Sequence, residues 1–264
     1  MPQWYPNLFS GMPSYGGYIY MTGDPTKIFR NVILSNLGLK IWFYLSLGGF
    51  GTFFLLRVLG TSTTAGVLGG LITGITPYNF GLVNAGHLNK IFALAYVPWV
   101  IACFLLFLKN KDLKSLCFLS LVTALQLWAN HPQIVYYTWM IIGFYYLWNI
   151  ISDYKNQSLS PRTIACQTGG VLVALLVAFL IVSDPYKEVY TFQKYSNRGA
   201  KSVLDKTNDT SSGTNWQYAT QWSFHPKELI SFVYPYFYGL QNFSTRDLKS
   251  GAYWGYMPFT QSTH

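Results

Sequence analysis

Three histidines with neighbouring aromatic residues offer the clearest chemistry in this sequence. His87 lies in "NAGHLNK", His131 in "WANHPQIVYY" and His225 in "WSFHPKEL". Imidazoles and lysines can bind phosphate, and aromatic faces can pack on sugar rings, so this mixture suits a ligand with an anionic head and a sugar-like body. Simpler roles are also open, because His131-Pro132 can begin a helix and His87 can be a solvated loop residue.

The acidic residues limit the kinds of transport chemistry that the chain can support. The sequence contains nine Asp and Glu residues, and none lies at the centre of an apolar run. Proton pumps and ion-coupled carriers usually bury a carboxylate at mid-membrane. Nucleotide-binding glycine loops, zinc-protease motifs and serine-hydrolase motifs are missing from the sequence. A proton pump or ion-coupled carrier is therefore disfavoured, whereas a site at the membrane surface remains open.

The composition is that of a membrane protein. Hydrophobic residues make up 51% of the chain and charged residues only 10%, against about 25% charged residues in soluble domains. The net charge of +9 comes from scattered basic residues, many of which flank apolar runs as headgroup anchors. Three cysteines lie inside apolar runs and predict neither a disulfide nor a zinc site. We expect a lipid bilayer and no nucleic acid as partner.

Six apolar runs approach the length of about 20 residues that a transmembrane helix needs. They cover about residues 39–58, 64–82, 90–108, 113–130, 133–151 and 164–183. Pro77 and Asn79 interrupt the glycine-rich second run, which either spans the membrane or forms a broken, partly re-entrant segment. The expected fold is an all-α polytopic membrane protein with about six transmembrane helices.

Polar segments flank this predicted bundle on both sides. We expect an outer-face loop over 1–36, the transmembrane bundle over 37–183 and a polar outer-face segment over 184–264. Within the last segment, residues 226–240 predict an interfacial helix, with a seventh crossing as the alternative. The N-terminus lacks a signal-peptide pattern and the C-terminus stops in mid-pattern, so we expect the chain to be part of a longer one.

The basic residues predict which loops face the cytoplasm. They concentrate in the loops after the third and fifth runs: Lys109, Lys111, Lys114, Lys155 and Arg162. The turn containing His87 carries only Lys90, and the turn containing His131 carries no Lys or Arg. We therefore expect both histidine turns and both ends of the chain on the outer face.

Five short motifs resemble, in order and spacing, segments of the bacterial YfhO-like membrane proteins. They are "PQWYPNLFSGMPSYG", "GHLNKIFALAYVPWV", "ANHPQIVYYTW", "YATQWSFHPKELISFVYPYFYG" and "YWGYMPFTQSTH". The resemblance covers nearly the whole chain and implies a glycosyltransferase similar to the GT-C type. Such enzymes transfer a sugar from a polyprenyl-phosphate donor to a cell-envelope polymer on the outer face of the bacterial cytoplasmic membrane.

The resemblance also implies where substrate would bind. Candidates for contacts to the donor phosphate or sugar are His87, His131, Gln133 and Tyr137, with Trp4 and Tyr5 at the entrance and Trp222 and His225 as its outer wall. The catalytic acid of GT-C enzymes follows the first transmembrane helix, upstream of where this chain begins. Asp24 is the only acid in the remaining loop and a weak candidate. We therefore expect this part of the chain to be inactive by itself, and a divalent metal ion is the one cofactor that the reaction could use.

A non-enzymatic membrane protein is the alternative, either a flippase-like transporter or an envelope-assembly scaffold. The lack of charge in the middle of the runs disfavours an ion-coupled transporter but not a scaffold. An acidic residue in the outer loop of the full-length protein, before "PQWYP", would favour the transferase.

The predicted orientation can be tested by cysteine labelling. We expect a cysteine at Asn130 to react with an impermeant reagent from outside, and one at Lys111 to react from inside. The reverse pattern would overturn the orientation.

Overall fold

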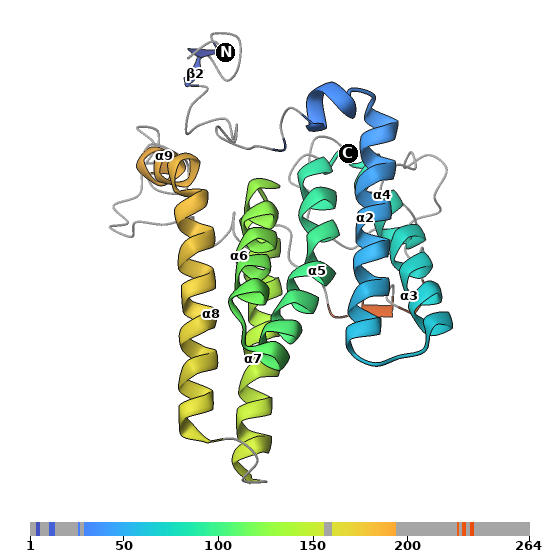
Figure 1. The fold of residues 1–264 in the computed structure, drawn as a ribbon. Coiled ribbons are helices and arrows are strands. Elements are labelled where there is room, and N and C mark those ends of the chain that lie inside the picture. The colour runs from blue at the N-terminus through green and yellow to red at the C-terminus, as the bar shows by residue number, and fades with distance from the viewer. Residues whose placement is uncertain are drawn as a thin grey trace. The chain divides into compact units, whose positions relative to one another are not determined.

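Apolar helices joined by short polar turns form most of the described chain (Figure 1). The structure, a computed structural model, describes residues 4–5, 11–13, 26, 29–155, 160–193, 226, 229–230 and 233–234. After a short π-helix, η1 (Phe29–Ile33), the helices are α2 (Leu37–Val58), α3 (Thr63–Ile75), α4 (Pro77–Asn84), α5 (Leu88–Asn110), α6 (Leu113–Trp128), α7 (Pro132–Lys155), α8 (Pro161–Ile181) and α9 (Ser183–Gln193). The chain divides into two compact units, Met1–Thr191 and Phe192–His264.

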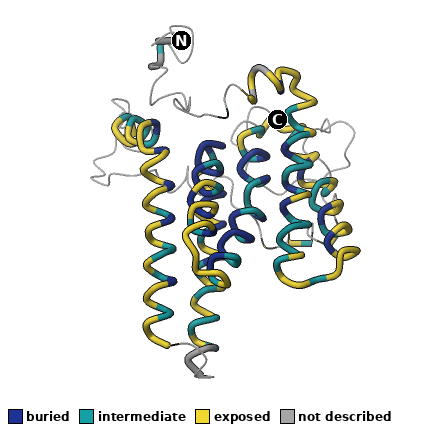
Figure 2. The backbone as a smooth tube through the Cα atoms, in the orientation of Figure 1, coloured by how far each residue is buried: buried dark blue, intermediate teal, exposed yellow. Residues whose placement is uncertain are grey.

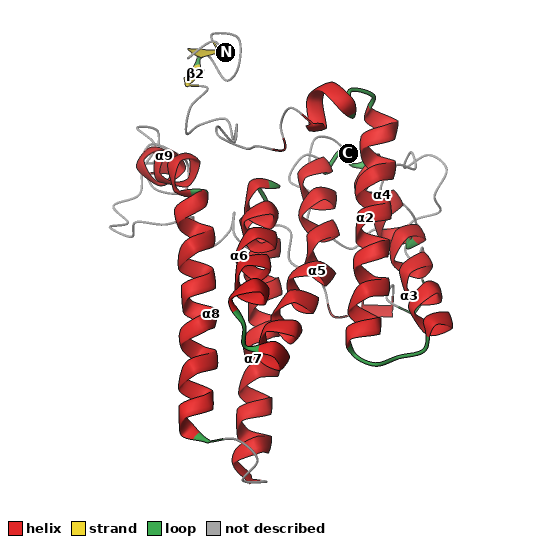
Figure 3. Cartoon of the chain, viewed as in Figure 1, coloured by secondary structure: helices red, strands yellow, loops and turns green. Residues whose placement is uncertain are grey.

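The expectation of an all-α polytopic membrane protein is confirmed, since helices make up most of the described chain (Figure 3). Five helical segments are long and apolar enough to cross a membrane: α2, α3 with α4, α5, α7 up to Ser152, and α8. The fourth expected span, 113–130, corresponds to α6, which has only 16 residues. At 1.5 Å per residue it extends about 24 Å, which is less than the roughly 30 Å of hydrocarbon.

Helices α3 and α4 confirm that the second apolar run is broken. Thr76 has extended backbone angles (φ −58°, ψ 138°), and Pro77 begins α4. The Asn79 side chain donates from Nδ2 to the carbonyl oxygens of Thr73 (2.8 Å) and Gly74 (3.3 Å). These carbonyls belong to the last turn of α3, where no helical N–H is available. Asn79 thus replaces the missing backbone partners.

Consecutive segments of the bundle run in opposite directions, so the turns before α5 and α7 lie at the same end of it (Figure 1). Polar side chains start several helices, with Ser62, Asp112 and Ser160 each accepting a hydrogen bond from a first-turn backbone N–H. Such caps satisfy N–H groups that have no partner within the helix.

Lys111 and Asn130 are unsuitable positions for the cysteine labelling that tests the orientation. Lys111 and Asn130 have φ values of 55° and 58°, and Asn130 is only 9% exposed. A cysteine is strained in this left-handed conformation. The exposed neighbours Asn110 and Gln133 test the same two ends of the bundle without that strain.

Helix α5 lies at the centre of the bundle (Figure 2). In the most apolar 18-residue stretch of α5, 56% of the residues are buried, whereas the corresponding share in the other four candidate spans is 17–22%. Gly48 of α2 faces Ala95 of α5, and Trp99 donates from Nε1 to the Leu47 carbonyl oxygen at 2.9 Å. Small residues at a crossing allow helices to pack closely in a membrane, where the hydrophobic effect does not draw them together.

The chain continues as a helix past the expected boundary at 184. We expected a polar segment there, but α9 covers Ser183–Gln193, with Asp184 in its first turn. Pro185 is buried, and Tyr186 donates from its hydroxyl to the Leu127 carbonyl oxygen at 3.1 Å. Asp and Pro early in a helix are favourable, because Asp complements the helix dipole and Pro needs no N–H partner there.

The contact between α2 and α3 should depend on the absence of side chains at Gly49 and Gly70. A Cβ on Gly70 would lie 2.7 Å from the Gly49 carbonyl oxygen, which is backbone and cannot rotate away. We expect Gly70→Ala to destabilise the protein by about 1–3 kcal/mol. Thermal unfolding of the detergent-solubilised protein measures this loss.

Gly143→Ala in α7 is the matched control. A Cβ at Gly143 meets nothing within 4 Å, and alanine favours a helix over glycine by up to about 1 kcal/mol. Equal stability of the two variants would contradict the close contact between α2 and α3.

Candidate functional site

Two turns at one end of the bundle carry the predicted histidines. His87 is exposed and precedes α5, while its backbone N–H donates to the Leu82 carbonyl oxygen at 2.9 Å. The carbonyl oxygen of His131 accepts from the Ile134 N–H at 3.0 Å, so His131 directly precedes α7 and Pro132 is the first residue of that helix. The structural role expected for His131-Pro132 is therefore confirmed. His131 is half-buried, and its Nδ1 atom has no hydrogen-bond partner among the residues that the structure describes.

An apolar cluster holds these two turns together. Ile91 and Phe92 of α5 belong to the same buried cluster as Ala129 and Ile134, which flank His131. Tyr44 of α2 packs on Phe92 with ring centroids 4.1 Å apart. Burial of these side chains fixes the start of α5 beside the start of α7.

The two histidines and Lys90 form what we call the cationic cluster. Burial first, and then the charge of Lys90, hold the pKa of His131 below its ordinary value of 6.5; a hydrogen bond of its own backbone opposes them, and the charge of His87 lowers the pKa by the smallest amount. Lys90 also places its Nζ atom 5.4 Å from the centroid of the Tyr78 ring. A positive potential at two helix N-termini is the arrangement that attracts an anion.

Gln133 and Tyr137 confirm the expectation that they share one face of α7. The Gln133 Nε2 atom donates to the Tyr137 hydroxyl at 2.8 Å, and both side chains are exposed. Residues four apart on a helix are neighbours on its surface. The pair therefore presents a polar surface one turn beyond His131.

The other predicted site residues are not brought into this cluster by the described structure. Trp4 and Tyr5 form β1, which pairs antiparallel with β2 (Met12–Pro13), so the expected N-terminal loop contains a short strand pair. Their side chains lie outside the described part. Asp24, Trp222 and His225 lie outside the described residues, as does most of the helix expected over 226–240. Their roles stay predictions.

A metal site is not formed by the part of the chain that the structure describes. Within that part, no group of three His, Cys, Asp or Glu side chains could hold a metal ion. The cationic cluster offers two imidazoles and one ammonium group, a donor set that suits an anion. The divalent metal ion stays a prediction.

A buried glutamine below the two turns was not recognised as important from the sequence. Gln126 of α6 is completely buried, and its Nε2 atom donates to the Thr138 hydroxyl (3.0 Å) and the Ala93 carbonyl oxygen (3.3 Å). These bonds join α6 to α7 and α5. The amide of Gln126 within the apolar stretch "ALQLW" was the available signal, since a lone amide in a membrane span needs an interhelical partner.

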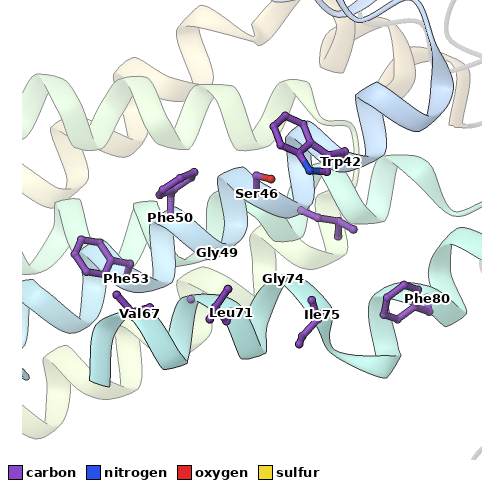
Figure 4. Close-up of a pocket in the computed structure, with 12 residues that line it drawn as sticks. Trp42, Ser46, Gly49, Phe50, Phe53, Val67, Leu71, Gly74, Ile75 and Phe80 are labelled. Carbon is purple, nitrogen blue, oxygen red and sulfur yellow. The ribbon is translucent and has the colours of Figure 1, made fainter. Parts of the chain in front are cut away.

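An apolar groove between α2 and α3 was also missed (Figure 4). It encloses about 580 Å³ and has aromatic walls formed by Trp42, Phe50, Phe53 and Phe80. Gly49, Gly70 and Gly74 also line the groove, and at these positions the backbone itself forms its surface. Gly66, Gly70 and Gly74 follow each other at intervals of four, which was the sequence signal for this surface.

No protein-family model, curated protein or solved structure matches this chain.

The coupling between Lys90 and His131 can be measured directly. We expect Lys90→Gln to raise the pKa of His131, because the variant removes a positive charge that opposes protonation of the imidazole. An NMR pH titration of histidine-labelled protein in detergent follows this shift. Lys109→Gln, at the other end of α5, removes the same charge and should leave the His131 titration unchanged. Equal titration curves of His131 in wild type and Lys90→Gln would show that the Lys90 charge does not act on His131, and would contradict the inclusion of Lys90 in the cluster.

Proposed function

We propose that this chain forms the membrane core of a YfhO-like, GT-C-type glycosyltransferase. It would transfer a sugar from a polyprenyl-phosphate donor to a cell-envelope polymer on the outer face of the bacterial cytoplasmic membrane. The observation that carries this proposal is the cationic cluster of His87, Lys90 and His131 at the starts of α5 and α7. These residues come from two separate turns, and the charges of Lys90 and His87 both lower the pKa of His131.

The cluster suits the leaving group of this reaction. A carboxylate accepts the proton of the acceptor hydroxyl, the hydroxyl oxygen bonds to the anomeric carbon, and the bond from that carbon to the phosphate oxygen breaks. Polyprenyl phosphate then leaves with additional negative charge. Lys90 and the imidazoles would stabilise that charge, as would the N–H groups at the helix starts. We place the accepting carboxylate outside the described residues.

The apolar groove supports a donor with a hydrocarbon chain. Its aromatic walls and small residues present a continuous apolar surface along α2 and α3. Phe80 of α4 lines the groove, and Tyr78, two residues earlier, packs under Lys90. The groove and the cationic cluster thus meet at α4. A lipid-linked phosphate would fit this pairing of an apolar surface with a positive end.

A flippase-like transporter is the second candidate, and the break between α3 and α4 favours it. Interrupted transmembrane helices often form the substrate site of transporters, and this one has an extended residue, Thr76, within a candidate span. An acidic residue in the outer loop of the intact protein would favour the transferase over this candidate.

Sugar transfer by the intact protein tests the proposal. We expect membranes that contain it to transfer radiolabelled sugar from a polyprenyl-phosphate donor to an envelope acceptor. Lys90→Gln combined with His131→Ala should reduce the rate at least about tenfold, since a hydrogen bond to a charged group contributes about 1.5–3 kcal/mol.

Lys114→Gln at the opposite end of the bundle is the control for loss of one positive charge and should retain the wild-type rate. Unchanged transfer in the double variant would remove the cationic cluster from the site. Failure of the intact wild-type protein to transfer sugar, with donor translocation across vesicles instead, would replace the transferase with the transporter.

A further inference from the structure

A second cavity lies on the other side of the contact between α2 and α3, next to the break at Thr76. It encloses about 300 Å³ between α2, the α3–α4 segment and α5. By the same measure one water molecule needs roughly 10–15 Å³. The cavity is therefore large enough for several water molecules.

Polar side chains from three helices line part of this cavity: Thr52, Thr73, Thr76, Tyr78 and Asn79. The hydroxyl of Thr52 donates to the Gly48 carbonyl oxygen (3.1 Å), and that of Thr73 donates to the Gly69 carbonyl oxygen (2.9 Å). Each hydroxyl has a single proton, so both oxygens keep lone pairs for an incoming donor. Thr76 precedes α4 but forms no side-chain cap.

Two helix interruptions border the same cavity. Thr76 stands at the break between α3 and α4, and Pro98 lies inside α5. Pro98 has no N–H for the carbonyl of Leu94, which also lines the cavity. Interrupted backbone at membrane depth is stable only where protein or water supplies the missing partners.

We propose that this cavity is a water-filled site within the membrane, which takes small hydrogen-bond donors. Water offers the protons that the threonine oxygens and the Leu94 carbonyl oxygen can accept. Tyr78, which is half-exposed and packs under Lys90, lines the cavity at the end where α5 begins. The cavity opens there, on the side of the histidine turns. This inference is independent of the sugar-transfer proposal.

Thiol labelling measures whether water enters the cavity. Methanethiosulfonate reagents attack the thiolate, which forms in water and not in hydrocarbon. The test uses cells that express the intact protein with Cys103, Cys117 and Cys166 changed to alanine, and the impermeant trimethylammonium-ethyl reagent. Thr73→Cys should react at least about tenfold faster than Ile72→Cys, its neighbour at the same depth. Ile72 is 66% exposed on the outside of the bundle.

Thr52→Cys on the opposite wall provides a second measurement, so the test does not depend on one variant folding. Phe50→Cys is its control, because Phe50 is 67% exposed outside the cavity. Faster reaction of the threonine positions from the side of the histidine turns supports the proposal. Rates equal to those of the two controls would show a dry cavity and overturn it. Reaction from the opposite side alone would overturn the position of the opening.

Discussion

The structure depends on one constraint: backbone polar groups within a bilayer find no water and must be paired inside the protein. Helices satisfy this along their length, and capping side chains such as Ser62, Asp112 and Ser160 satisfy it at several starts. The α3–α4 segment has the greatest need for such partners, because α3 ends within a candidate span and leaves backbone carbonyls without helical N–H donors. Asn79 meets the demand by donating to two carbonyls of the preceding turn. The break is therefore a stable element of this fold.

Glycine determines how closely these helices approach. Gly49 and Gly70 bring the backbones of α2 and α3 into direct contact, and Gly48 lets α2 lie against Ala95 of α5. Such an approach gains dispersion energy, which is the main attraction between helices in lipid. Larger side chains flank the contact between α2 and α3, and they leave an unfilled space on each side of it. The apolar groove occupies one side, and the cavity with the threonine side chains occupies the other.

The candidate functional site lies at the end of this bundle and depends on the packing beneath it. The apolar cluster around Phe92 and Ile134 brings two separate turns together, and Gln126 joins the three helices below them. Rigid support of this kind holds charged groups close to each other despite their repulsion. The lowered pKa of His131 reflects its partial burial first and the nearby charge of Lys90 second. An anionic ligand would offset the positive charge there, which is the physical basis of the phosphate-binding role that we propose.

Local features of the chain were predictable because they follow from neighbouring residues. The apolar runs located the bundle helices, Pro77 and Asn79 indicated the break, and the spacing of Gln133 and Tyr137 predicted their shared face. Helix α9 was not predicted, because the chain is polar after Ser183; its local signal was Asp184 and Pro185 in the first turn.

Contacts between distant residues required the tertiary structure. The sequence by itself determined a membrane bundle with histidines at its turns, because hydropathy and helix-breaking residues act over short distances. Only the packing decided that Lys90 lies near His131, that Gln126 meets Thr138, and that Gly49 touches Gly70. The reason is that many pairings of apolar helices are compatible with the same hydropathy pattern. Side-chain shape and interhelical hydrogen bonds select one of them.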